Sequence, residues 1–426
     1  MALVEYDAAS DEMVGFVLPD SEPCPKATSV AFVAECFARH SIATGVYSYM
    51  LSTSSNEHPP MLLASIPTDN KFTSPDVRER WTLIFKACKT AGINIRFIAS
   101  DGDARLLSAM LLEARGDAKS FSVLPDTTYS PKRTDFILRF APSLADFRVY
   151  FQDVIHGCLK YMKPVRNGII LKMGAFMISK SSLESVLNNA TTVEAFLDLP
   201  FLPRDLEAAD RQNFPCAFRL FSTETIGAVS KQPLSKGIVI FLTVVNDYCT
   251  AFLHPTMPML ERVAKLWSCV TFLRYWRVWA KLENYNVDNV TISRNTFIGI
   301  ELSSHSFIAL LQFCRREHSS LETLNPWTWT SQSCEMHFNI SRSYSPQGSS
   351  QLNFSPHGYF QRASSLSREN AFRSMKDITK IIYPEHRKHK TVDSAIINFS
   401  ARRPGIHIHD ITEEQVLKAM DAGVDR

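Results

Sequence analysis

An acidic turn follows an apolar, β-branched run near residue 100. The run extends from Ile95 to Ser100 and is followed directly by Asp101, Gly102 and Asp103. A buried strand that ends in this way delivers a carboxylate to the edge of a sheet. Such a carboxylate can bind a hard divalent cation, for example Mg²⁺, which prefers oxygen ligands. Aspartate and glycine also favour turns, so an ordinary exit from a strand is the competing interpretation.

Two later acidic residues stand in comparable settings. Asp153 follows the aromatic and β-branched run Phe147–Gln152, and His156 comes three residues later. Glu335 stands at the predicted start of a helix, within the segment Ser331–Phe338. Together with Asp101, these residues form an ordered series of three acidic segments.

Taken in order, the three segments resemble the nuclease core of cut-and-paste DNA transposases of the P-element and hAT type. In the family pattern a strand ends in an SDG or TDRG turn, a D-x-x-H segment follows, and a glutamate lies in QPCE-x-x-FR. The matching residues here are Ser100–Gly102, Asp153 with His156, and Cys334 with Glu335. The resemblance extends from about Glu5 to Lys390 and includes four further segments, Asp210–Phe214, Leu260–Trp267, Phe272–Arg277 and Asn295–Leu302.

The resemblance implies an α/β fold, in which an RNase H-like mixed sheet is flanked by helices and interrupted by a large, mostly α-helical insertion. It also implies three acidic residues that hold two Mg²⁺ or Mn²⁺ ions, which activate water or a DNA 3′-hydroxyl for strand cleavage and transfer. Residue by residue, Asp101 matches the second acid and Glu335 the third. Asp103 is the weaker match for the second acid. Asp153 is interpreted as a supporting residue, with direct metal ligation kept as the alternative.

The front of the chain departs from the family pattern. Tyr6–Phe16 matches the family hairpin Y-D-x-x-S-D-x-x-V-G-F, which the first acid precedes. Only five residues stand before this hairpin, so the strand that carries the first acid is expected to be absent. We therefore predict that the chain as given neither cleaves nor joins DNA. Asp7 and Asp11 are interpreted as solvated turn residues, although Asp7 could substitute for the first acid.

Apolar spacing divides the chain into four predicted parts. Residues 1–167 form the RNase H-like α/β portion, since strand and helix patterns alternate there. Residues 168–325 form the helical insertion, residues 326–390 return to the core with the helix of Glu335, and residues 391–426 form a tail. Pro164 is expected to interrupt the helix that follows Asp153. The elements predicted in the first part are strands at 13–19, 45–51, 60–66 and from 93 onward, and helices at 76–91 and 104–114.

Basic residues suggest a surface for nucleic acid. Arg274, Arg277 and Lys281 recur at three and four residues within the predicted helix Met259–Leu282, so they share one face. Solvated surface charge is the competing interpretation. Further candidates for DNA contact are Arg362, Arg368 and Arg373. Glu301 and His305 stand four residues apart on a helix, a spacing that suits either a metal pair or a satisfied core pair.

Composition bounds the class of protein. The 426 residues are 45% hydrophobic and 21% charged, which is typical of a globular protein with a substantial core. A formal charge of +3 argues neither for nor against nucleic acid. Nine cysteines contain no CxxC pair, which excludes a standard zinc finger and indicates reduced thiols. No secretory segment is present, and the apolar run Gly237–Val245 is too short to cross a bilayer. A nuclear or cytoplasmic location follows.

Three functions remain open. The first is a transposase-derived protein that is inactive as a recombinase and retains weak DNA binding. The second is an interaction or scaffold protein on the same fold, and the third is a residual metal-dependent nuclease. The expected partners are DNA and a further copy of the chain in a homo-oligomer, with no membrane. A zinc-finger module is not expected in this chain.

Overall fold

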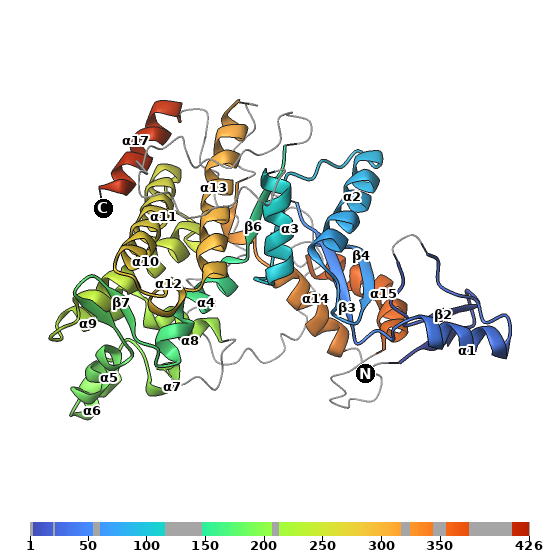
Figure 1. Cartoon of the computed structure of the whole chain (residues 1–426), viewed down its shortest axis with the longest axis horizontal. Helices are drawn as coiled ribbons and strands as arrows, with labels where there is room; N and C mark the ends of the chain where they lie inside the picture. The colour runs from blue at the N-terminus through green and yellow to red at the C-terminus, as the bar shows by residue number, and fades with distance from the viewer. Residues whose placement is uncertain are drawn as a thin grey trace. The chain divides into compact units, whose positions relative to one another are not determined.

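The computed structural model describes residues 3–19, 22–53, 60–115, 147–206, 213–316, 324–343, 355–374 and 411–425 (Figure 1). The chain divides into two compact units. The first unit joins Met1–Asn94 to Ser331–Lys390, and the second joins Ile95–Thr330 to Thr391–Arg426. Each unit is therefore built from chain segments far apart in sequence. The units are described one at a time.

The first unit consists of two hairpins and four helices among its described residues. A short hairpin is formed by β1 (Glu5–Asp7) and β2 (Glu12–Val14), and a longer antiparallel one by β3 (Gly45–Leu51) and β4 (Met61–Thr68). Helix α2 begins after a capping box in which Thr73 and Asp76 satisfy each other's backbone N–H groups. The four helices are α1 (Val30–Arg39), α2 (Ser74–Thr90), α14 (Gln332–Ser343) and α15 (Pro356–Ser374).

Tyr359 ties the late helices of the first unit to its longer hairpin. Its buried hydroxyl on α15 lies 3.0 Å from Ser48 Oγ on β3 and 3.3 Å from Ser65 Oγ on β4. The same hydroxyl lies 2.9 Å from Nε2 of His337, which stands on α14. Burial lowers the pKa of His337. These contacts explain how residues after 330 complete a unit that begins at the N-terminus.

The second unit is mostly helical and is built around one pair of parallel strands, β5 (Phe97–Ser100) and β6 (Val149–Gln152). Helix α13 (Arg294–Arg316) covers the other edge of β6, where the Ser303 and Ser306 hydroxyls accept hydrogen bonds from the N–H groups of Gln152 and Tyr150 at 3.0 and 3.2 Å. Its remaining described elements are α3 (Ala104–Arg115), α4 (Val154–Arg166), β7 (Leu171–Met173), β8 (Phe176–Ile178), α5 (Ser181–Asn188), α6 (Val193–Leu197), α7 (Pro203–Leu206), α8 (Phe214–Leu220), α9 (Thr223–Ser230), α10 (Lys236–Leu253), α11 (Met259–Leu282), α12 (Val287–Val290), α13 (Arg294–Arg316), the 3₁₀ turn Pro326–Thr328 and α17 (Glu413–Val424).

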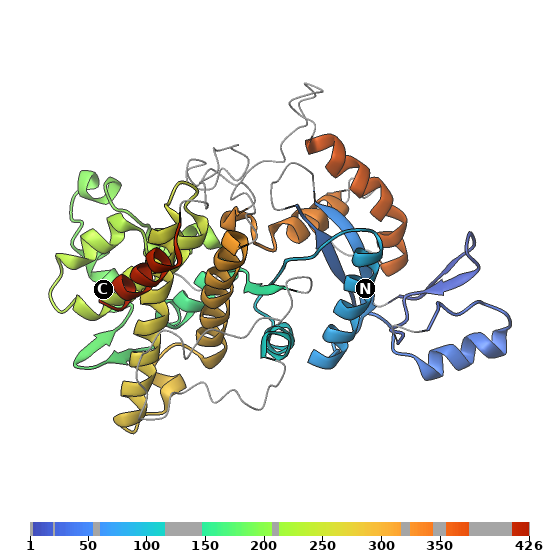
Figure 2. The same ribbon diagram turned by 90° about the horizontal axis from the view of Figure 1, so that it is seen from above.

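The core of the second unit lies among α10, α11, α13 and β6 (Figure 2). Trp329 packs against the rings of Phe151 and Phe97, with ring centroids 4.5 and 5.3 Å apart. Arg262 on α11 is fully buried, and its guanidinium donates to the carbonyls of Ala251, Phe252 and His254. These carbonyls stand at the C-terminal end of α10 and have no partner within the helix. A charged side chain thus caps one core helix from another.

The C-terminal helix α17 packs against α11 in the second unit. A Cβ atom on Gly423 would lie 2.5 Å from the carbonyl oxygen of Ala264, so only glycine allows this close approach. Arg315 on α13 also pairs with Glu413 at 3.1 Å. Part of the predicted tail is therefore a structural element of the second unit.

The expectation of a mixed α/β chain is confirmed. Hydrogen-bonded strands in the described ranges form four two-stranded sheets, of which only β5–β6 is parallel. Because β3–β4 and β5–β6 belong to different units, their union in one RNase H-like sheet stays a prediction. The segment from 168 to 325 contains the β7–β8 hairpin and then helices α5 to α13. The predicted domain boundaries are not tested by this arrangement.

Two local predictions are wrong. The first strand ends at Val14, short of Pro19, because Gly15 has a φ of 125° that turns the chain. Helix α4 continues through Pro164 to Arg166, although an interruption was expected there. Proline removes one helical hydrogen bond, and this loss is tolerated at Pro164 because the helix ends only two residues later, at Arg166.

Within the described parts of the chain, two helices are long and apolar enough to span a membrane. These are Lys236–Leu253, which is 67% buried, and Arg294–Arg315, whose most apolar 18-residue window is 94% buried. The expectation from Gly237–Val245 underestimated the first of these helices. Helices buried to this extent are also typical of a protein core. The predicted location of the protein stays untested.

Candidate functional site

Two of the three predicted acids lie at the same edge of the parallel pair. In the register of β5 and β6, Ser100 stands opposite Gln152, so Asp101 and Asp153 each follow the last paired residue. The backbone N–H of Asp153 donates to the carbonyl of Ser100 at 2.7 Å. Carboxyl ends of neighbouring parallel strands are where many α/β folds place their sites. We call the turn Asp101–Asp103 together with Asp153 the strand-end edge.

Asp101 is exposed at this edge and belongs to a tight turn. Its carbonyl accepts hydrogen bonds from the Ser100 hydroxyl at 3.0 Å and from the N–H of Asp103 at 2.8 Å. Its carboxylate Oδ1 lies 3.4 Å from the N–H of Asp103. Both interpretations made from the sequence therefore hold for the backbone: Asp101 ends a strand, and it forms a turn.

Asp103 is engaged by its neighbour Arg105. The Arg105 guanidinium donates to both carboxylate oxygens, at 3.0 and 2.7 Å. These hydrogen bonds lower the pKa of Asp103 despite its partial burial. The carboxylate thus has a cation of its own and serves the start of α3.

Asp153 is fully buried and caps helix α4. Its Oδ1 accepts hydrogen bonds from the N–H groups of Ile155 at 2.7 Å and His156 at 3.3 Å. His156 Nδ1 lies 3.4 Å from the second carboxylate oxygen. An N-cap carboxylate satisfies helix N–H groups that lack partners, and it interacts favourably with the helix dipole. This geometry gives Asp153 a structural role, while its suitability as a metal ligand stays untested.

Lys160 reaches the strand-end edge from α4. Its ammonium donates a hydrogen bond to the carbonyl of Gly102, between the two aspartates of the turn. Burial lowers the pKa of Lys160, and the nearby charges of Asp101 and Asp103 oppose that shift. Lys160 was not singled out from the sequence alone. The signal that could have revealed its position is the spacing of two helical turns after the N-cap Asp153.

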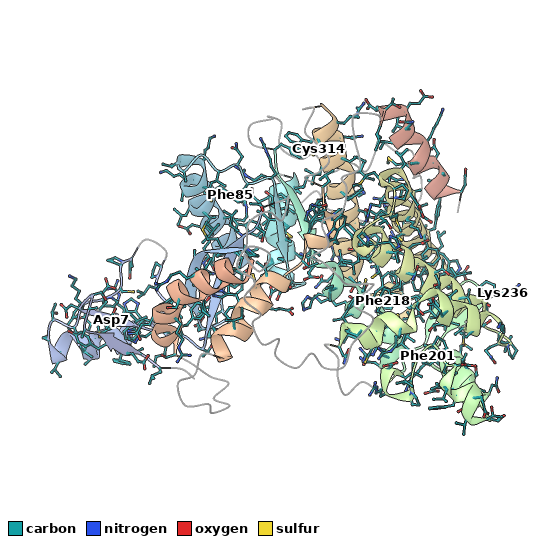
Figure 3. The ribbon with its side chains drawn as sticks, turned by 180° about the vertical axis from the view of Figure 1, so that it is seen from behind. Asp7, Phe85, Phe201, Phe218, Lys236 and Cys314 are labelled. Carbon is teal, nitrogen blue, oxygen red and sulfur yellow. The ribbon has the colours of Figure 1, made fainter. Side chains whose placement is uncertain are left out.

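Glu335 lies in the first turn of α14 and is exposed. Its place at the start of a helix is as predicted. It belongs to the first unit, whereas Asp101 and Asp153 belong to the second. Convergence of Glu335 with Asp101 therefore stays a prediction. Asp7, labelled in Figure 3, accepts hydrogen bonds from Ala9 N–H and Ser10 Oγ at 3.1 and 3.0 Å, as a turn residue does.

The strand-end edge fits a divalent cation poorly. Among the described residues, no group of three or more His, Cys, Asp or Glu side chains is arranged to hold a metal ion. Asp103 is paired with Arg105, Asp153 is committed to the N-terminus of α4, and Lys160 brings a positive charge to the turn. Two clustered dications would need carboxylates that are not already neutralised.

The exposed basic face expected on α11 is not present. The Arg274 guanidinium donates to both carboxylate oxygens of Glu301 and lies 3.1 Å from His305 Nε2. Arg277 is buried and donates to the carbonyl of Ile292 at 2.9 Å and to Asp288 at 2.9 Å. Lys281 is the exposed member of the three. The spacing was right, but the face points toward α12 and α13.

Glu301 and His305 form a satisfied core cluster with Arg274. His305 Nε2 lies 3.3 Å from Glu301 Oε2, and both side chains are buried. Burial raises the pKa of Glu301, but the Arg274 guanidinium and His305 outweigh that effect and hold the pKa at about 2. Of the metal pair and the core pair left open by the sequence, the structure shows the core pair.

The remaining basic candidates lie on α15. Arg362 is half-buried and lies 3.4 Å from the carbonyl of Ser341, and Arg368 is exposed. The side chain of Arg373 lies outside the described residues. A further set of basic residues, the α2 stripe, was not predicted from the sequence and lies on α2 of the first unit. Its members are exposed and, at helical periodicity, share one face: Arg78, Lys86 and Lys89.

Comparison with known proteins gives one informative likeness. No family model and no curated protein matches the sequence. A chain of the Drosophila P element transposase strand transfer complex is similar in structure, with a TM-score of 0.54 and 11% sequence identity. The likeness covers 89% of this chain and 75% of that chain. The fold is transposase-like. The likeness does not extend to the roles of the acidic residues, to metal binding or to DNA contact.

Proposed function

We propose that this chain is a transposase-derived protein that binds duplex DNA and does not cut it. The observation that carries the proposal is the transposase-like fold over 89% of the chain. It is supported by the position of Asp101 at a strand-end edge, where the resemblance puts the second acid. Fold alone does not fix function, so the two halves of the proposal rest on separate observations.

The absence of cleavage follows from the electrostatics of the strand-end edge. A two-metal mechanism needs carboxylates that neutralise two dications about 3.5–4 Å apart. Of the three aspartates here, Asp103 has Arg105 as its partner and Asp153 has the helix N-terminus with His156. Asp101 remains, with Lys160 beside its turn. Even with Glu335 added, the set falls short of the charge that two metals require.

DNA binding is proposed through the α2 stripe of the first unit, with Arg368 of the same unit as an additional cation. Arg78, Lys86 and Lys89 are exposed along one helix face, an arrangement that suits successive phosphates of a duplex. Phosphate contacts of this kind release counterions, so affinity falls steeply as salt is raised. They also carry little sequence information, so binding is expected to be indifferent to sequence.

The test is fluorescence anisotropy of a labelled 20-base-pair duplex, titrated with the full chain in EDTA at several salt concentrations. We expect weak binding that is lost as salt rises, and a flatter salt dependence for the Lys86→Glu and Lys89→Glu double variant. Lys236→Glu, an exposed change at the start of α10, is the matched control (Figure 3). No binding at the lowest salt would reject DNA as the partner.

A second candidate function is protein interaction on the same fold. Helix α6 is short and exposes most of its apolar side chains, namely Val193, Phe196 and Leu197. Exposed apolar clusters of this kind mark interaction sites in soluble proteins. Absence of DNA binding, together with self-association that Leu197→Asp abolishes, would support this function instead.

A further inference from the structure

The strand-end edge already contains a cation that belongs to the protein. Lys160 stands on α4, two helical turns after the N-cap Asp153, and its ammonium donates to the carbonyl of Gly102. Gly102 lies between Asp101 and Asp103, so the ammonium sits within the acidic turn. Lys160 is half-buried, and its hydrogen bond to the carbonyl of Gly102 places the ammonium at this turn.

Gly102 is the residue that admits this lysine. A Cβ atom on Gly102 would lie 2.0 Å from the Nζ of Lys160, 2.8 Å from its Cε and 3.2 Å from its Cδ. The end of the lysine chain thus occupies the space that any other side chain at position 102 would fill. The backbone of Gly102 has an ordinary φ, so close packing against Lys160 is the constraint here.

Each carboxylate of the edge has a different counter-charge. Asp103 accepts from the Arg105 guanidinium at 2.7 Å, and Asp153 accepts from two backbone N–H groups of α4. Asp101 is the exposed carboxylate, and Lys160 is the cation that interacts with it across the turn. A divalent cation at Asp101 would therefore have to displace or repel an ammonium that the fold holds in place.

We propose that Lys160 is a built-in counter-ion that takes the place of a divalent cation at the strand-end edge. It neutralises the Asp101–Asp103 turn, holds it against α4 and keeps Mg²⁺ and Mn²⁺ away from Asp101. The choice of these cations rests on the proposed function. The DNA-binding assay contains EDTA and therefore no free divalent cation, so its outcome does not depend on whether Lys160 excludes Mg²⁺ or Mn²⁺. Either proposal can fail while the other stands.

The experiment measures Mn²⁺ binding to the full chain by the loss of the free Mn²⁺ signal in electron paramagnetic resonance. Wild-type protein is expected to have no saturable Mn²⁺ site that depends on Asp101, so Asp101→Asn should leave its Mn²⁺ binding unchanged. Lys160→Met is expected to gain such a site, because a repelling unit charge is gone, and to bind Mn²⁺ at least about tenfold more tightly than any residual binding by wild type. Lys163→Met, an exposed lysine one turn later on α4, is the matched control and gains nothing.

A second variant keeps the lysine and all the aspartates. Gly102→Ala places a methyl group where Lys160 Nζ now lies, so the flexible end of the lysine side chain must move away from the turn. This variant should also gain the Mn²⁺ site. The proposal is overturned if wild-type protein binds Mn²⁺ at a site that Asp101→Asn removes. It is equally overturned if folded Gly102→Ala and Lys160→Met, judged by circular dichroism, bind no more Mn²⁺ than wild type.

Discussion

The strand-end edge and helix α11 both gather charged residues in the second unit, and their surroundings differ. At the edge, Asp101 is exposed and Asp103 is only partly covered, so solvent reaches the charges. On α11, Arg274 and Arg277 face α12 and α13. Arg274 forms an ion pair with Glu301, and Arg277 pairs with Asp288 and donates to a backbone carbonyl. The carboxylates of Asp101 and Asp103 therefore contribute little to stability, whereas the charges on α11 maintain the core. Substitutions in the two regions test whether their contributions to stability differ in this way.

The largest effect is expected at Arg274. Arg274→Ala leaves Glu301 buried without its main partner, and breaking a buried ion pair in this way costs about 3–5 kcal/mol. The free energy of unfolding from urea titration is the measurement. Lys281→Ala on the same helix should change stability by less than about 0.5 kcal/mol, because Lys281 is exposed. Equal losses in the two variants would show that α11 does present a basic face.

The next effect is a dependence of stability on pH. Glu301 has a pKa of about 2 in the folded chain against 4.5 as its ordinary value. A depressed carboxyl pKa stabilises the fold fully above pH 4.5, and this contribution is lost as pH falls from 4.5 toward 2. The depression corresponds to about 3 kcal/mol. Urea titrations across this pH range should show a fall in stability that is shallower in Glu301→Gln. An identical pH dependence in both proteins would contradict the assignment.

A smaller effect is expected at the edge, from Asp153. Asp153→Ala removes the cap of α4 and should lower the free energy of unfolding by about 1–2 kcal/mol. Asp153→Asn keeps a hydrogen-bond acceptor there and should cost less. The comparison uses thermal unfolding of both variants beside wild type. Equal losses for asparagine and alanine would mean that the negative charge, and not the hydrogen-bond acceptor of the cap, is what the fold requires.

The smallest effect is expected from Asp101. Asp101→Asn should shift stability by less than about 0.5 kcal/mol, because its carboxylate is exposed. Thermal unfolding at neutral pH measures this. A large loss would show that Lys160 and Asp101 form a tight structural pair, which would remove the contrast between the edge and α11.

The sequence predicted that strands end next to Asp101 and Asp153, because an apolar run followed by an acid is a local signal. The parallel pairing that brings these two residues side by side was not predicted from the sequence. The direction of the α11 face could not be predicted, because this helix buries apolar residues on several sides and its spacing suits more than one orientation. The partner of Lys160 could not be predicted either, since it depends on how α4 packs against the turn between β5 and α3. The same holds for Glu335, whose unit is completed by chain segments far apart in sequence.

The central claim, that the edge does not perform metal-dependent cleavage, is tested most directly by nicking of supercoiled plasmid DNA. Purified full chain is incubated with plasmid and either Mg²⁺ or Mn²⁺, beside Asp101→Ala, and the relaxed form is quantified on a gel. Neither the wild-type chain nor Asp101→Ala is expected to nick the plasmid above background. Nicking by the wild-type chain that Asp101→Ala abolishes would contradict it and would establish a metal-dependent nuclease.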